Sequence, residues 1–235
     1  MPSSCPSGRG IVMTEALLAV LQFADGLFPS GGFAHSFGLE TYAQAGTVRD
    51  SIGVAEFVRS QLQGNAGPAD AVAAAGAARQ ARASDLAGCV EIDWRLDAMK
   101  WVPEFRAASV QMGRQTALAA ESAGGQFMSA MTRAIDGADM PGHHAVVFGA
   151  ALGRQGADPE TVAAAYLYST ATLLVHAALR LVVFGQLEGQ RLLASLRPLI
   201  ARLAREAAEA GADFLEDGGD ILKMATTFWK MAATF

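Results

Sequence analysis

The amino-acid sequence predicts an all-α protein, a single-domain helical bundle of about eight to ten helices. Alanine is abundant while valine, isoleucine and threonine are comparatively scarce, and alanine favours helix because it loses no side-chain entropy there. Several helix-start signals occur, the strongest at residues 158–161. The sequence contains no convincing pair of strands with hairpin chemistry and no internal repeat of 20–50 residues.

The N-terminal half is predicted to alternate helices with turns. A helix starts at Thr14-Glu15, carries a leucine stripe and stops near Asp25-Gly26. Residues 27–40 (LFPSGGFAHSFGLE) contain a proline and three glycines, which predict a loop or a broken helical junction. Further helices are expected after Asp50, over residues 69–83 and from Ser84-Asp85 to Met99, with a break in the chain at residues 64–68 (GNAGP).

The C-terminal half is predicted to hold longer helices. Pro103-Glu104 suits a first helical turn, and we expect one helix from there to about Glu121 and a short one over residues 126–135. Asp158-Pro159 starts a helix that runs to Phe184, since Asp caps a helix and Pro fits its first position. Residues 190–210 are amphipathic, with Pro198 expected to kink or divide them.

Composition and charge restrict the compartment and the kind of partner. The net charge is −5 and the pI about 5.4, which argues against nucleic-acid binding and a polybasic membrane surface. Residues 171–184 are the most apolar stretch but are too short to span a bilayer, so a buried core helix is expected. With no signal peptide and two lone thiols, Cys5 and Cys89, the sequence predicts a reduced, cytoplasmic protein.

The sequence carries no recognisable catalytic or metal-binding motif. The four histidines (His35, His143, His144 and His176) lie in no zinc-ligand spacing, and no metal or cofactor is predicted. Gly31-Gly32 lacks the Lys-Ser/Thr of a phosphate-binding loop. No GxSxG elbow is present, and Ser36 or Ser30 with His35 is a poor nucleophile–base pair because sequence neighbours rarely reach that geometry.

The glycine-rich segment is the most unusual part of the chain. It places Phe28, Phe33 and Phe37 around His35 and ends in Glu40. On physical grounds it is first a tight helix–helix junction, in which glycine allows close backbone approach and phenylalanine fills the core.

Three stretches together resemble the urease accessory protein F family, UreF. Residues 21–48 (LQFADGLFPSGGFAHSFGLETYAQAGTV) are similar to the family's N-terminal signature. Residues 103–109 (PEFRAAS), followed by Met112-Gly113, are similar to its E-x-R-x-A-S block. Residues 178–182 (ALRLV), with the Gly-Gln pairs at 185–186 and 189–190, are similar to its third block. The resemblance spans about residues 15–210.

The resemblance implies an all-α, dimeric protein that is not itself an enzyme. UreF proteins act with the scaffold UreD (also called UreH) and the GTPase UreG to deliver nickel to apo-urease, recruiting UreG and coupling its GTP hydrolysis to activation. When the resemblance is carried over to this chain, it implies a surface that faces UreG and a structural junction. The UreG-facing residues are Glu40, Glu104, Arg180 and Gln186. The junction residues are Pro29, Gly31, Gly32, Phe33, His35, Ser36 and Gly38.

The C-terminal end departs from the family. UreF chains usually end in a tail containing His and Arg that reaches the scaffold, whereas this chain ends in GGDILKMATTFWKMAATF. We therefore expect a loose segment over residues 1–12, a UreF-like domain over 13–210 and an atypical tail over 211–235.

Two other functions remain open from the sequence. One is a helical hydrolase or isomerase that uses His35, Glu40 or Glu104; the other is a helical small-molecule-binding or regulatory module without catalysis. The mean hydropathy of +0.24 without a membrane span indicates apolar surface kept for partners. We expect this apolar surface at the Phe-rich junction and at the C-terminal stretch.

Overall fold

The centre of the molecule is a pair of helices that pack backbone against backbone. The computed structural model describes residues 9–213, and within them α4 (Val72–Arg82) and α7 (His144–Arg154) are almost wholly buried. A Cβ on Gly149 would overlap the carbonyl oxygen of Ala74, and one on Gly153 would lie 2.5 Å from the carbonyl oxygen of Ala78. Small residues therefore bring these two helices together.

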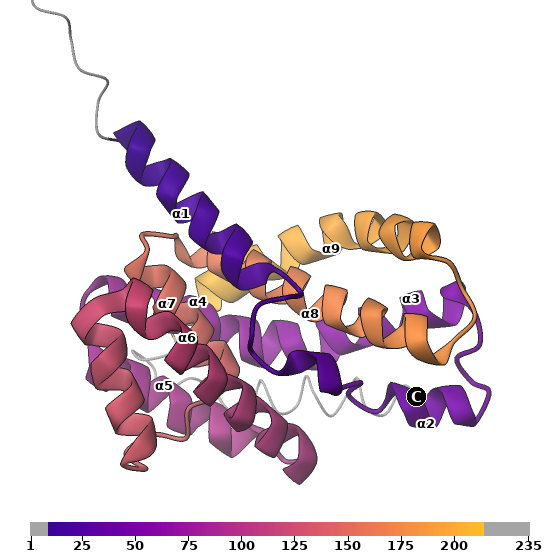
Figure 1. Cartoon of the computed structure of the whole chain (residues 1–235), viewed down its shortest axis with the longest axis horizontal. Coiled ribbons are helices and arrows are strands. Elements are labelled where there is room, and N and C mark those ends of the chain that lie inside the picture. The colour runs from indigo at the N-terminus through magenta and orange to yellow at the C-terminus, as the bar shows by residue number, and fades with distance from the viewer. Residues whose placement is uncertain (1–8, 214–235) are drawn as a thin grey trace, which may run out of the picture.

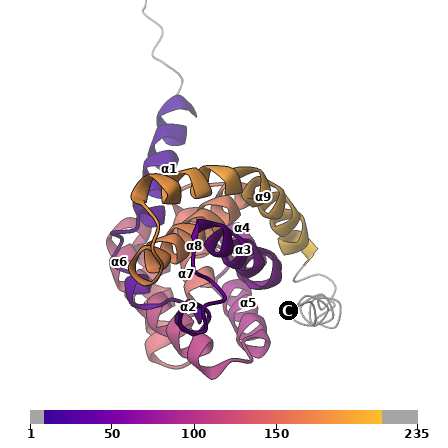
Figure 2. The ribbon, with the colours of Figure 1, turned by 90° about the vertical axis from the view of Figure 1, so that its right-hand side faces the viewer.

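The remaining helices form layers around this pair, giving an all-α, single-domain bundle (Figures 1 and 2). The hairpin of α8 (Pro159–Leu181) and α9 (Gln186–Asp213) packs on one side. The helices α5 (Leu86–Met99) and α6 (Pro103–Asp136) pack on α4 and α7. The described residues contain no strand. The fold class predicted from the sequence is confirmed.

Helix α1 (Arg9–Ala24) projects from the body in both views and contacts it mainly through its C-terminal part (Figures 1 and 2). Phe23 is buried, whereas Leu17, Leu18 and Leu21 of the leucine stripe are each more than half exposed. The stripe therefore lies on open surface. The short helix α2 (Leu39–Gln44) follows after the junction.

The predicted break at residues 64–68 is wrong. Helix α3 (Ser51–Gln61) continues through a π-helical segment, η2 (Leu62–Ala71), directly into α4. The wider π turn tolerates Pro68, which has no N–H to donate. A Cβ on Gly67 would lie 2.7 Å from the carbonyl oxygen of Leu62, so the glycine fits this tight turn rather than ending the helix.

Other helix boundaries agree with the sequence or shift by a few residues. The side chains of Asp50, Asp85 and Asp158 cap helices α3, α5 and α8 as expected. The two helices expected between residues 103 and 135 are joined across a kink at Gly125 (φ 58°, ψ −146°).

The hairpin turn between α8 and α9 is shorter than predicted. Helix α8 ends at Leu181, because the backbone of Val182 is extended. Helix α9 starts at Gln186, because the Glu188 carboxylate accepts a hydrogen bond from the N–H of Gly185 at 3.0 Å and so caps the helix. Pro198 lies inside the continuous helix α9.

The apolar stretch around residues 171–184 lies mainly in α8. This helix is long and apolar enough to cross a membrane by length and composition alone, but 56% of its most apolar window is buried within the fold. It packs against α9, α4 and η2. This burial supports the predicted core helix.

Candidate functional site

The junction between α1 and α2 is a compact series of turns. The Asp25 carboxylate accepts from the N–H of Leu27 at 2.8 Å, and the Asp25 carbonyl accepts from the N–H of Phe28 at 3.0 Å. Residues Gly32–Ala34 form a 3₁₀ turn, η1. Gly31 and Gly38 have φ of 77° and 87°, a left-handed backbone that favours glycine. These glycines are required by conformation, as expected for a structural junction.

The junction packs on α6 and α8. A Cβ on Gly32 would lie 2.5 Å from Leu173 and 3.0 Å from Met112. The Phe37 ring lies 5.6 Å from that of Phe105, edge to face, and Phe37 itself has a φ of 50°. The buried Ser36 accepts through its carbonyl oxygen from the N–H of Leu39 at 3.2 Å. These contacts fix the backbone that carries the motif.

Arg180 of α8 joins the junction through Phe33. Its guanidinium carbon lies 4.2 Å from the centre of the Phe33 ring, and its Nη2 donates to the Phe33 carbonyl oxygen at 2.9 Å. The Phe33 ring is 70% exposed. The result is an aromatic side chain held on the surface by a cation from a core helix.

The other predicted UreG-facing residues are not brought into contact with Arg180. Glu40 lies in the first turn of α2, Glu104 in the first turn of α6 and Gln186 at the start of α9, all exposed. Within residues 9–213 none of their side chains makes a hydrogen bond or ion pair. Glu104 is next to Phe105, so it lies at the edge of the junction.

His35 contacts a neighbouring aromatic ring rather than a serine hydroxyl. Its ring packs 6.1 Å from the Phe37 ring, and no hydrogen bond links it to Ser36 or Ser30 in the described part of the chain. The exposed Pro29 and half-buried His35 shape the turn. A cleft of about 300 Å³ lies beside the junction, lined by Asp25, His176 and Arg180 among others. His176 is thus half-buried at this cleft rather than enclosed in the core.

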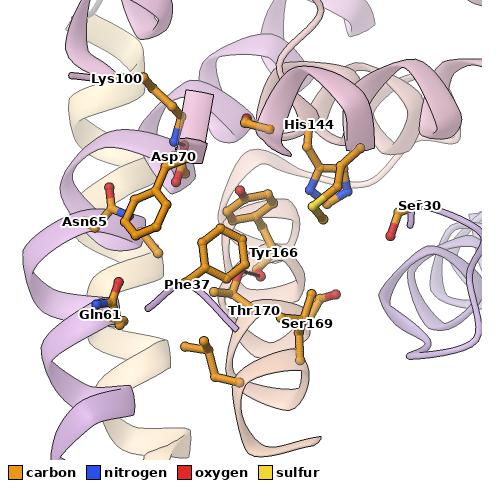
Figure 3. A pocket seen from close by; sticks show the side chains of 16 residues that line it. Ser30, Phe37, Gln61, Asn65, Asp70, Lys100, His144, Tyr166, Ser169 and Thr170 are labelled. Atoms are coloured by element: carbon orange, nitrogen blue, oxygen red, sulfur yellow. Dashed lines mark hydrogen bonds and ion pairs between the residues drawn. The ribbon is translucent and has the colours of Figure 1, made fainter. Parts of the chain in front are cut away.

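A second, interior site lies under the junction (Figure 3). This cavity of about 60 Å³ contains a buried ion pair, in which Lys100 Nζ lies 2.6 Å from Asp70 Oδ1. Tyr166 and His144 also face it and are buried. Burial raises the pKa of the Tyr166 hydroxyl well above 10 and lowers that of His144 to about 4, so both are neutral at pH 7. Sequence reasoning missed this cavity because its residues come from five separated segments.

A buried polar chain next to the cavity ties α5, α6 and the loop before α7 together. His143 Nδ1 lies 3.1 Å from Ser109 Oγ, and its Nε2 lies 3.0 Å from Asp97 Oδ1. Arg106 makes two 2.6 Å hydrogen bonds to the same carboxylate. Burial opposes the charged form of Asp97, but bonds from Arg106 and His143 outweigh it and lower its pKa. Burial lowers the pKa of His143.

The linked side chains of Ser109, His143 and Asp97 are the residue types of a hydrolytic triad, and here they join α6, the loop before α7 and α5. Ser109 and His143 are both buried, and the Asp97 carboxylate is already bound at both oxygens by Arg106. Close by, the Asp93 carboxylate accepts from the N–H groups of Gly142 and His143 at 2.5 and 2.9 Å, and burial raises its pKa to about 7. The loop before α7 is thereby fixed to α5.

No metal site is formed by the adjacent histidines. His143 points to Ser109 and Asp97, while the His144 ring packs against Phe148 and Tyr166. Across residues 9–213 no group of three or more His, Cys, Asp or Glu side chains could hold a metal ion.

Comparison with known proteins identifies the family. The UreF family model matches residues 48–197. The chain is 35% identical to the urease accessory protein UreF of Cereibacter sphaeroides over 199 residues, covering 84% of this chain and 86% of that protein. It is 32% identical over 198 residues to the UreF of a Bacillus species, covering 82% and 86%. It is also 32% identical to UreF 2 of Brucella canis, covering 84% and 81%.

These similarities place the chain among accessory proteins rather than among proteins named for a reaction. The chain belongs to the UreF family of urease accessory proteins.

Proposed function

We propose that this UreF-family chain is a docking subunit of urease maturation. In this role it binds the GTPase UreG and the scaffold UreD/UreH, recruits UreG to apo-urease and couples GTP hydrolysis to nickel insertion. It carries no catalytic residue of its own and acts in the cytoplasm as a homodimer. Its membership of the UreF family supports the role in urease maturation.

The observation that carries the docking role is the Phe33–Arg180 pair. An exposed aromatic ring is costly to order, but here η1 and the Arg180 hydrogen bond hold it in place before a partner arrives. A preorganised aromatic and arginine pair is typical of the residues that dominate protein interfaces.

Three exposed polar side chains at helix starts, two of them carboxylates, extend the proposed interface. Glu40, Glu104 and Gln186 have no intramolecular partner among the described residues, so binding a basic partner surface would break no existing ion pair. Hydrogen bonds that the Glu40 and Glu104 carboxylates accept from a basic partner are charge-assisted, and such bonds are short and strong. We assign Glu40 and Arg180 the main roles, with Glu104 and Gln186 at the edge.

Co-purification with UreG and with UreD, with urease activation as the readout, tests the function. The intact chain should bind both proteins and support activation, and binding neither would disprove the proposal. Glu40→Ala and Arg180→Ala should keep the fold but weaken UreG recruitment. Glu56→Ala and Arg191→Ala, which remove exposed charges on α3 and α9, are matched controls that should bind normally. Unchanged affinity in both site variants would remove these residues from the interface.

The interior cavity supports a second candidate function, a small-molecule-binding or regulatory module. Its buried Tyr166 and His144 face a space large enough for several water molecules, at about 10–15 Å³ each. Thermal unfolding with and without a library of small polar solutes tests it. A stabilising solute whose effect is lost in Tyr166→Phe would support this alternative, and its absence together with UreG binding would favour the docking role.

A further inference from the structure

A wide surface groove lies between α5, the first half of α6 and the loop before α7. Its volume is about 720 Å³, much larger than that of the interior cavity. It lies on a different side of α6 from the junction: Phe105 and Met112 face the junction and cavity, whereas Arg106, Val110 and Arg114 face the groove.

Both tryptophans of the described region line this groove. The Trp101 side chain is 81% exposed and that of Trp94 is 49% exposed. Trp94 is fixed in place, because its Nε1 donates to the Asp139 carbonyl oxygen at 3.0 Å. Tryptophan is the residue type most often found as a binding hot spot, because it buries a large area with few rotatable bonds.

The groove is positive on an acidic protein. Lys100, Arg106 and Arg114 line it, and once Lys100 is paired with Asp70 and Arg106 with Asp97 the lining keeps one positive charge, while the chain as a whole has a net charge of −5. Asp97 and Asp70 neutralise Arg106 and Lys100, and Arg114 makes no ion pair with any residue of the described region. An approaching anionic group therefore meets the one unpaired guanidinium of the lining, that of Arg114, in a groove that two indole rings also line.

We propose that this groove binds an acidic peptide segment of a partner protein, with apolar side chains between its carboxylates. Arg114 and the outer edge of the Arg106 guanidinium would bind the carboxylates, and Trp94 and Trp101 would pack on the apolar side chains. A basic segment is disfavoured by the net positive lining, and a small molecule would leave most of the groove open. The choice of partner rests on the proposed function, so its sources are UreG, UreD and the urease subunits.

The test uses an array of synthetic 15-residue peptides that cover UreG, UreD and the urease subunits, probed with the full chain. Bound peptides should be acidic, and their solution affinities, measured by fluorescence anisotropy, should fall about tenfold or more in Trp101→Ala and in Arg114→Glu. Leu118→Ala and Arg133→Glu are the matched controls: both change exposed residues of α6 outside the groove and should leave the affinity unchanged.

Other occupants of the groove would give different results in these experiments. Failure of every peptide to bind, binding only of uncharged or basic peptides, or unchanged affinity in Trp101→Ala overturns the proposal. A dimer that becomes monomeric in Trp101→Ala, seen by sedimentation, would assign the groove to a second copy. A synthetic peptide of residues 214–235 that outcompetes all partner peptides would assign it to this chain's own tail. Both outcomes also overturn the proposal.

The groove and the docking function fail separately. If intact UreG and UreD do not bind the unmodified chain, the docking function fails. If they bind, but no acidic peptide does and the two groove variants behave as the original chain, only the groove proposal fails.

Discussion

The guanidinium of Arg180 stacks 4.2 Å from the Phe33 ring centre while its Nη2 donates to the carbonyl oxygen of the same residue. One arginine from α8 thus holds both the side chain and the backbone of a residue 147 positions away in sequence. This contact adds to the packing of Gly32 and Phe37 and joins the exposed part of the junction to α8.

The first prediction concerns this pair. A double-mutant cycle of Phe33→Ala and Arg180→Ala, measured by chemical unfolding, should give a coupling free energy of about 0.5–1 kcal/mol, as for an exposed cation–π contact. Arg180→Lys should recover only part of it, because an ammonium group does not stack as a planar guanidinium does. Arg191→Ala combined with Phe33→Ala is the control and should be additive; a coupling of zero for the Arg180 pair would contradict the contact.

The second prediction is a pH dependence from His144. Burial lowers its pKa to about 4, from an ordinary 6.5 in the unfolded chain. As the pH falls from 6.5 towards 4, the unfolded chain gains a proton that the folded chain does not, so the free energy of unfolding decreases.

Comparison with His144→Gln isolates this effect. Between pH 7.5 and pH 5 the original chain should lose up to about 2 kcal/mol more stability than the variant, measured by urea unfolding at each pH. Asp93 acts in the opposite direction. Burial raises its pKa to about 7, so its contribution to the free energy of unfolding is present at low pH and is lost as the pH rises from 3.8 to 7. Both proteins retain Asp93, so its effect cancels in the difference. Parallel pH profiles would show that His144 is not kept neutral by burial.

The third prediction tests the contact between α4 and α7. Gly149→Ala and Gly153→Ala should each destabilise the fold by about 1–3 kcal/mol or more, because the new methyl group meets the carbonyl oxygens of Ala74 and Ala78. Gly53→Ala in α3 is the control, since its Cβ would meet only atoms at 3.4 Å or beyond. That variant should be neutral or more stable by up to about 1 kcal/mol. Thermal unfolding distinguishes these outcomes.

The fourth prediction concerns the thiol of Cys89. Burial, with further contributions from Asp85 and Asp93, raises its pKa to about 12, and its Sγ lies 3.7 Å from the Ala77 carbonyl oxygen. In a Cys5→Ser variant, Cys89 should not react with a disulfide reagent at pH 8 until denaturant is added. Rapid labelling of the folded protein would show that α5 opens locally.

The sequence was sufficient for the fold class and for most helix ends. Asp50, Asp85 and Asp158 were recognisable as caps, because a cap depends on residues within one turn. The error at residues 64–68 has a physical cause: Gly and Pro usually end a helix, but the packing of η2 against α8 and α9 offsets that local preference. The atypical tail expected over residues 211–235 lies almost wholly outside the described residues, as does Cys5.

The candidate site was only partly predictable. The junction motif and Arg180 could be found from the sequence, and the expected surface exposure holds for Phe33, while Phe28 and Phe37 are half-buried. Local sequence carries no signal for the stacking of Phe33 on Arg180, for the Asp70–Lys100 pair or for the groove with Trp94 and Trp101. Each of these joins segments that only the folded chain brings together. The interface roles of Glu40, Glu104, Arg180 and Gln186 stay predictions.

The π-helical segment η2 determines how α4 faces the core. Each residue advances an α-helix by about 100°, so the loss of one residue between Leu62 and Ala71 would rotate α4 against α3 by roughly that angle. The alanines that meet Gly149 and Gly153 would then turn away from α7, although no core residue had changed. Homologous chains should therefore keep the number of residues in this segment.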